Sequence, residues 1–260
     1  MGLGCYNPYD YDIAILKQFG NEYRLTLHSV LRKQGFECDD EKKRKKGSVN
    51  DEKLLCNLRR TKQTIFELAI CNDWDYFCTF TLDSKKYDRY NLKKFQSDFT
   101  QLIRDLRKKY QCDIAYLLIP EKHKNGAWHM HGFIKGLPDN ELRLFSLDEK
   151  LGSYIIQKLK NGETVVEWTS YRKKFGFCDL EPINNLNKAS AYVTKYVTKD
   201  LLNSVQELNH KSYYCSKGLN RSIVLKKGHL AQCPSFDFEN EYVKIKTSHN
   251  LDELLNLFSE

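Results

Sequence analysis

In the central region, segments in which apolar residues recur at the spacing of a β-strand are followed by segments in which they recur at the spacing of an α-helix. Residues 75–82 alternate with period two and predict a strand whose apolar face carries Cys78 and Phe80. Residues 91–110 repeat apolar side chains at helical spacing behind Asn91, a residue type that often caps helices. The same reasoning predicts strands over 113–119, 127–135, 164–168 and 177–183, and helices over 153–159 and 187–202.

The two ends of the chain carry weaker patterns. Alternation on both sides of a turn at 19–21 predicts a hairpin, and the basic run 42–46 that follows is typical of a solvated linker. A helix is predicted from Asp51 to about Ile70, and short strands over 223–225 and 242–245. We therefore expect a hairpin and basic linker over 1–48, a main domain over 49–210 with its motif core at 74–202, and a C-terminal extension over 211–260.

This order of elements predicts an α+β fold, a central antiparallel sheet with helices packed on one face.

Apolar residues make up 41% of the chain, enough for a buried core, but the longest apolar run, 114–119, is too short to cross a bilayer. The first residues show no series of basic, apolar and small residues, so we do not expect secretion. No two of the nine cysteines lie within five residues of each other, which favours reduced thiols over a zinc site or disulfides. We expect a cytoplasmic protein with no membrane partner.

The chain carries 42 basic and 34 acidic side chains, a formal charge of +8. A surplus of this sign suits a polyanion such as DNA, because neutralising phosphates releases condensed counterions. It is also common in proteins that bind no nucleic acid, so charge alone does not assign the partner.

Two histidines stand in the predicted strand 127–135. His129 and His131 are two residues apart and point to one face, as two metal ligands would, while Trp128 and Met130 point to the other. By itself such a pair is more often two surface histidines.

The turn before this strand strengthens the metal interpretation. Residues 124–126 fit a three-residue hairpin loop with Gly126 in the left-handed conformation. That loop pairs Glu121 with His129 and puts Glu121 and His123 on the histidine face. A two-residue loop would instead bury the Glu121 carboxylate on the core side, at a high cost. The expected site has two histidines and one carboxylate, which suits Mn²⁺ or Mg²⁺, with zinc as an alternative.

Further polar side chains are predicted around this site as DNA contacts. Thr79 and Thr81 share one face of their strand and line the histidine surface if the two strands are neighbours, although threonine also simply favours strands. Lys124 lies in the predicted hairpin loop, and Lys122 lies two residues before it.

The segment 190–200 repeats the tetrapeptide Tyr-Val-Thr-Lys. On one helix Tyr192 and Tyr196 are neighbours one turn apart, and so are Lys195 and Lys199. A tyrosine hydroxyl is a poor nucleophile at neutral pH unless positive charge favours its phenolate, and these lysines supply that charge. The alternative is an amphipathic helix with partly exposed tyrosines.

Three motifs in order resemble those of the HUH endonuclease superfamily: Phe80-Thr81-Leu82, then His129-Met130-His131-Gly132-Phe133, then Tyr192 and Tyr196-Val197-Thr198-Lys199. Within it the chain is similar to the rolling-circle replication initiators of bacterial plasmids and single-stranded DNA phages. The resemblance covers about residues 74–202, and the paired tyrosines are its most specific part.

The resemblance implies a sheet of about five strands akin to an RNA-recognition fold. It implies nicking of single-stranded DNA at an origin hairpin through a 5′-phosphotyrosine, by Tyr196 and Tyr192 with Lys199 and Lys195. The metal would be held by His129, His131 and Glu121, with His123 as the alternative third ligand. The printed sequence has no GxxxxGK[ST] loop, so a host helicase would unwind the duplex and a host polymerase would extend the 3′ end.

Two other functions fit the same residues. A transposase or conjugative relaxase would use the same chemistry, and a non-catalytic nucleic-acid-binding domain would use only the sheet.

Overall fold

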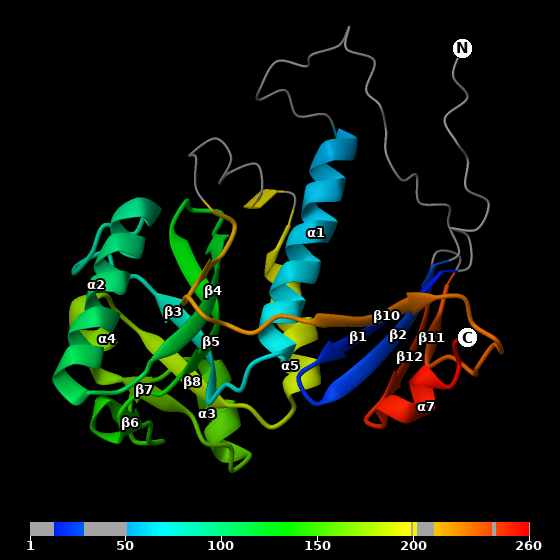
Figure 1. Ribbon diagram of the computed structural model, residues 1–260. Helices are drawn as coiled ribbons and strands as arrows, with labels where there is room; N and C mark the ends of the chain where they lie inside the picture. Colours follow the sequence, from blue (N-terminus) through cyan, green and yellow to red (C-terminus); the bar gives the residue numbers. More distant parts are fainter. Residues whose placement is uncertain (1–12, 29–50, 199, 202–210, 241–242, 260) are drawn as a thin grey trace, which may run out of the picture. The chain divides into compact units, whose positions relative to one another are not determined.

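The computed structural model describes residues 13–28, 51–198, 200–201, 211–240 and 243–259, with backbone alone for 51–56. They form two compact units (Figure 1). The larger is made by residues 51–219, and the smaller by the described parts of 1–50 and 220–260.

A seven-stranded antiparallel sheet in the order β6-β7-β8-β3-β5-β4-β9 forms the middle of the larger unit. Its strands are β3 Tyr76–Thr81, β4 Ala115–Lys122, β5 Trp128–Lys135, β6 Leu142–Leu144, β7 Val166–Trp168, β8 Cys178–Pro182 and β9 Tyr214–Cys215. The antiparallel sheet and the mixed class are confirmed, but the predicted number of about five strands is wrong. The edge strands β6 and β9 have three and two residues, too few to display alternation in the sequence.

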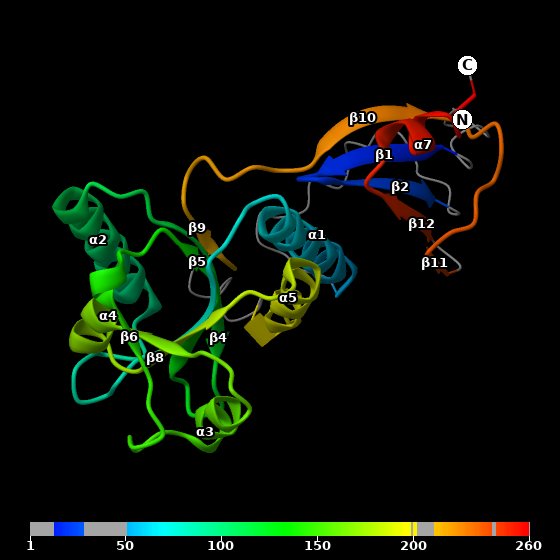
Figure 2. The same cartoon turned by 90° about the horizontal axis from the view of Figure 1, so that it is seen from below.

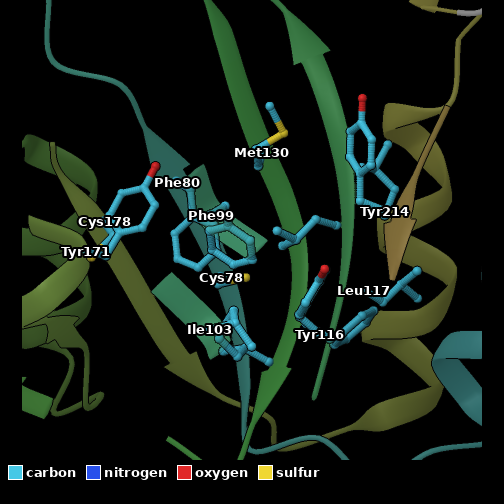
Figure 3. Close-up of a cluster of buried hydrophobic side chains, with 14 of the residues drawn as sticks. Cys78, Phe80, Phe99, Ile103, Tyr116, Leu117, Met130, Tyr171, Cys178 and Tyr214 are labelled. Carbon is cyan, nitrogen blue, oxygen red and sulfur yellow. The ribbon is translucent and has the colours of Figure 1, made fainter. Parts of the chain in front are cut away.

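One face of this sheet is covered by α2 Leu92–Tyr110 and α4 Thr169–Lys174. Phe80 lies between these helices, with ring centroids 4.4 Å from Tyr171 and 5.7 Å from Phe99. Figure 3 shows this side of the core, where Met130 and Cys178 join the aromatic side chains. Trp128 is also buried here, so it is a core residue and is not exposed for stacking on DNA.

The opposite face is covered by α5 Leu186–Val193, with α1 Asp51–Ile70 beside it (Figure 2). The Phe77 side chain points to the opposite face of β3 from that of Phe80. Its ring centroid lies 5.6 Å from that of Tyr192. The prediction that the helices pack on one face is therefore wrong. The sheet is apolar on both sides, because Phe77 and Phe133 face away from Cys78 and Phe80. The remaining helix, α3 Ser153–Lys160, starts where the sequence predicts it.

The smaller unit is an antiparallel sheet in the order β10-β1-β2-β12-β11, with α7 Leu251–Leu255 as its helix. Its strands are β1 Ala14–Phe19, β2 Glu22–His28, β10 Ile223–Gly228, β11 Phe238–Glu239 and β12 Val243–Ser248. The predicted hairpin is β1 and β2. Leu16 and Leu25 are fully buried in one cluster with Leu254 and Phe258, so the two ends of the chain share one core.

Gly132, in β5, allows two strands to approach closely. A Cβ added there would lie 1.9 Å from the carbonyl oxygen of Leu117, a backbone atom that cannot rotate away. We expect Gly132→Ala to lower the free energy of unfolding of the larger unit by about 1–3 kcal/mol or more. Urea unfolding followed by tryptophan fluorescence measures this, because all three tryptophans lie in that unit.

Gly152→Ala is the matched control. A Cβ at Gly152 meets nothing within 4 Å, so its free energy of unfolding should stay within about 0.5 kcal/mol of the original. Equal effects of the two substitutions would contradict the close approach at Gly132.

None of the helices in the described part of the chain combines the length and the apolar character that crossing a bilayer requires.

Candidate active site

The histidine hairpin has the predicted register. β4 pairs with β5 so that Glu121 lies opposite His129 and Ile119 opposite His131. The amide of His123 donates to the Ala127 carbonyl at 2.9 Å, which closes the three-residue loop. Gly126 has a φ of +83°, a conformation in which glycine is strongly favoured. Loop chemistry and the avoidance of a buried carboxylate thus predict the arrangement correctly.

The four polar side chains of the hairpin contact one another in two pairs. His131 Nε2 lies 2.8 Å from Glu121 Oε2, and the rings of His123 and His129 stack with centroids 3.7 Å apart. His123 Nε2 is 3.7 Å from the same Glu121 oxygen. Both candidates for the third ligand therefore lie on the histidine face, and the choice between them stays open.

Both strand histidines are held neutral. Burial, followed by repulsion from His123 and His131, lowers the pKa of His129 to about 4. Burial, followed by the charge of Lys195, lowers the pKa of His131 to about 3. Neutral imidazoles have a free lone pair, the form that binds metal ions.

The tyrosine segment reaches this histidine face. The ring of Tyr196 lies flat on the imidazole of His131, with centroids 3.9 Å apart and planes 4° from parallel. The Tyr196 hydroxyl donates to that of Tyr192 at 3.4 Å. Val193, Val197 and Leu201 follow the same spacing along the chain and are buried, so they anchor the segment in the core.

The prediction of a single helix over 187–202 is wrong. α5 ends at Val193, a 3-10 turn η4 covers Thr194–Tyr196, and Val197 is extended. Valine and threonine are poor helix formers, and the Thr194 hydroxyl donates to the Ala191 carbonyl at 2.7 Å in competition with the helix. Lys199, predicted to act with Lys195, lies outside the described residues.

The two phenols differ in acidity. Partial burial favours the neutral form of Tyr192, but hydrogen bonds from Lys195 and Tyr196 outweigh this effect and lower its pKa. Burial, followed by the hydrogen bond to Tyr192, raises the pKa of Tyr196 above its ordinary value. The Lys195 ammonium lies 3.4 Å from the Tyr192 ring centroid and 4.8 Å from that of Tyr196. Positive charge is therefore closest to Tyr192.

The predicted DNA contacts divide between the two faces. Thr79 and Thr81 lie opposite His131 and His129 in the β3–β5 register, and the Thr81 hydroxyl is 3.4 Å from His129 Nδ1. Lys124 is exposed in the hairpin loop. Lys122 points to the other face, where its ammonium lies 5.7 Å from the Trp128 ring centroid. Alternation along β4 thus separates Lys122 from the histidines.

Asp179 is a neighbour of the site that sequence reasoning missed. It lies opposite Thr79 in the β3–β8 register, in line with Thr79 and His131, and is buried. The alternation of Asp179 and Glu181 with apolar residues was visible in the sequence, but the pairing of β8 with β3 was not.

Asp179 predicts a pH-dependent stability. Burial, followed by repulsion from Glu181, raises the pKa of its carboxyl to about 7. A raised folded-state pKa contributes stability that is complete below the unfolded pKa of about 4 and is lost as the pH rises through 7. Asp179→Asn should therefore be more stable than the original chain at pH 8, by roughly 2–4 kcal/mol, and about equal at pH 4. Urea unfolding at both pH values measures this, and a difference independent of pH would contradict it.

The donor set has the chemistry of a site for a divalent ion. Glu121, His129 and His131 offer a carboxylate and two neutral imidazoles, and His131 Nδ1 is buried and has no hydrogen-bond partner in the part of the chain that the structure describes. Among the described residues, no three His, Cys, Asp or Glu side chains are already arranged to hold an ion. In the described geometry Glu121 is instead hydrogen-bonded directly to His131, so an ion would have to replace that contact.

Comparison with known proteins supports the resemblance drawn from the three motifs. Residues 75–201 match the family model described as replication-associated protein ORF2/G2P. No curated protein and no solved structure matches the chain. The RNA-recognition-like form of the sheet therefore stays a prediction.

Proposed function

We propose that this protein nicks and rejoins single-stranded DNA through a tyrosine nucleophile, because residues 75–201 match the model of the replication-associated protein ORF2/G2P family, a family of rolling-circle replication initiators. The observation that carries the proposal is the stacking of Tyr196 on His131, with the hydroxyl of Tyr192 3.4 Å from that of Tyr196. This contact brings two potential nucleophiles to the one face that carries the hairpin histidines.

In the proposed first step, the Tyr196 oxygen attacks the scissile phosphorus and the bond from phosphorus to the 3′-oxygen breaks. The products are a 5′-phosphotyrosine and a free 3′-hydroxyl, once the departing oxygen takes up a proton. Tyr192 is placed to accept the Tyr196 proton, because Lys195 stabilises the Tyr192 phenolate. The energy of the phosphodiester is retained in the tyrosyl bond, so rejoining needs no ATP.

A divalent ion, Mn²⁺ or Mg²⁺, would be held by His129, His131 and Glu121, with His123 as the alternative to Glu121. When bound, it would withdraw negative charge from a non-bridging oxygen of the scissile phosphate. Burial keeps the two histidines neutral and therefore able to bind it.

Lys195 contributes a second positive charge on the phenol side of the site, next to both tyrosines. A fixed cation there stabilises the phenolate and the charge that develops on the phosphate during attack. Lys199 is proposed for the same role on the basis of its spacing in the sequence.

The proposed DNA partner is a single-stranded segment at an origin hairpin, exposed with the help of a host helicase. Thr79, Thr81 and Lys124 are proposed contacts on the histidine side. The free 3′-hydroxyl would then be extended by a host polymerase.

Incubation of the full chain with a pool of 3′-labelled single-stranded oligonucleotides tests this function, because the 3′ label stays on the fragment that becomes joined to the tyrosine. With Mn²⁺ we expect cleavage and a protein–DNA adduct that survives denaturation, and with EDTA neither. Sequencing of the captured strand then identifies the origin and separates an initiator from a transposase or relaxase, whose captured strands would come from element ends or transfer origins. Binding without cleavage under all metal conditions would identify a non-catalytic DNA-binding domain and overturn the proposal.

A further inference from the structure

The loop between β3 and α2 lies directly beside the histidine hairpin. The amide of Trp128, the residue before His129, donates to the carbonyl of Arg89 at 2.9 Å. Two ring carbons of Tyr90 lie 3.6 Å from the position that a Cβ on Gly126 would occupy. Arg89 and Tyr90 are therefore neighbours of the hairpin loop and of the first histidine.

This loop is held in place on both sides. The Tyr87 hydroxyl donates to Asp98 of α2 at 2.7 Å, and the Tyr87 ring packs on Phe175 with centroids 5.1 Å apart. Within the loop itself, the amide of Tyr90 donates to the Asp88 carboxylate at 3.0 Å. A side chain on such a loop is already positioned before a ligand arrives, which lowers the entropic cost of binding.

Tyr90 exposes 55% of its surface although its backbone is fixed. Its neighbour Arg89 donates to the Tyr90 hydroxyl at 3.2 Å and lies 5.4 Å from the ring centroid. A guanidinium group beside an exposed aromatic ring is the combination that binds a phosphate and the base attached to it.

We propose that Arg89 and Tyr90 form a nucleotide-binding subsite for single-stranded DNA, adjacent to the nicking site. Tyr90 stacks on a base and Arg89 binds a neighbouring phosphate. The position of this subsite relative to the scissile phosphate rests on the proposed function. Its capacity to bind single-stranded DNA does not.

Single-stranded DNA is the occupant that the two side chains favour. Stacking on Tyr90 needs an unpaired base, which duplex DNA does not offer, and Arg89 needs an anion. Arg89 is also joined by its carbonyl to the amide of Trp128, so a phosphate held by Arg89 lies close to the strand that carries His129.

Fluorescence anisotropy with two probes in EDTA tests the two roles separately. The probes are a labelled 20-nucleotide oligothymidylate and an abasic oligomer of equal length. Tyr90→Ala should weaken binding of oligothymidylate about 5- to 100-fold and leave binding of the abasic oligomer unchanged. Arg89→Gln should weaken both, and should reduce the slope of log K against log salt concentration by about 0.7, the value for one phosphate contact on a single strand.

Two control variants accompany these. Tyr90→Phe keeps the ring and should bind like the original chain. Arg104→Ala removes one exposed arginine of α2, whose side chain contacts Gln101, and should leave both affinities within about twofold. Unchanged binding of oligothymidylate by Tyr90→Ala, or an unchanged salt slope for Arg89→Gln, would overturn the corresponding half of the proposal.

The result is distinguishable from a failure of the proposed function. If the original chain forms no covalent adduct but the Tyr90 and Arg89 variants lose affinity as described, the subsite stands and the nicking function falls. If the adduct forms and these variants bind normally, the nicking function stands and the subsite falls.

Discussion

Replacement of both phenols, Tyr192→Phe with Tyr196→Phe, is expected to abolish the covalent protein–DNA adduct and to reduce nicking by at least about 10⁴-fold. The reason is that the double variant removes both proposed nucleophiles, the hydroxyl of Tyr196, whose ring stacks on His131, and that of Tyr192, 3.4 Å away from it. The substitutions remove only two oxygen atoms and keep both rings, so packing on Phe77 and on His131 should survive. Adduct formation is measured on denaturing gels with 3′-labelled DNA and Mn²⁺, and DNA binding by anisotropy.

The single variants test the division of work between the phenols. Tyr196→Phe should lose the first adduct, whereas Tyr192→Phe should retain it at a reduced rate, because the acceptor for the Tyr196 proton is gone. Tyr154→Phe is a matched control, since its hydroxyl donates to Glu181 and is proposed for no step. An adduct that persists in the double variant would refute the assignment of the nucleophiles, and an adduct lost only in Tyr192→Phe would reverse their order.

The second large effect is expected at His131. We expect His131→Ala to lower the nicking rate about 10³-fold, because it removes a proposed metal ligand and with it several kcal/mol of charge stabilisation. Affinity for single-stranded DNA in EDTA should change little. Nicking rates are compared with Mn²⁺ affinity from titration calorimetry, a readout that a purely structural role of His131 would not alter.

His131 is buried under the Tyr196 ring, so the alanine variant also leaves a cavity. His131→Asn keeps most of the side-chain volume. Urea unfolding of both variants shows whether a lower nicking rate comes from a lost metal ligand or from a destabilised fold. His249→Ala, in the smaller unit, removes an exposed histidine that is hydrogen-bonded to the Asn21 carbonyl and should change neither the nicking rate nor the Mn²⁺ affinity. If both His131 variants nick DNA and bind Mn²⁺ as well as the original chain does, His131 is not a metal ligand. The same measurements on Glu121→Gln and His123→Ala decide the third ligand.

The local patterns of the sequence were sufficient to predict many of the helices and strands of the larger unit. Helix α2 begins after Asn91 and ends at Tyr110 as predicted, because its cap and apolar spacing are encoded within about twenty residues. The helix over 187–202 failed because its valines and threonines oppose the helix that its spacing suggests. The edge strands β6 and β9 were missed because strands of two or three residues carry no readable period.

What the sequence alone determined is the histidine hairpin with its polar side chains on one face, and the four-residue spacing of Tyr192 and Tyr196. Both depend on interactions between residues at most about ten positions apart, through strand alternation, loop conformation and the cost of burying a carboxylate. The tertiary structure decided which surfaces meet: Tyr196 on His131, Asp179 beside Thr79, and Arg89 with Tyr90 beside the hairpin. It also decided that the two ends of the chain share a sheet. These contacts join segments tens to hundreds of residues apart, and they follow from strand pairing and the packing of apolar faces, which no local period specifies.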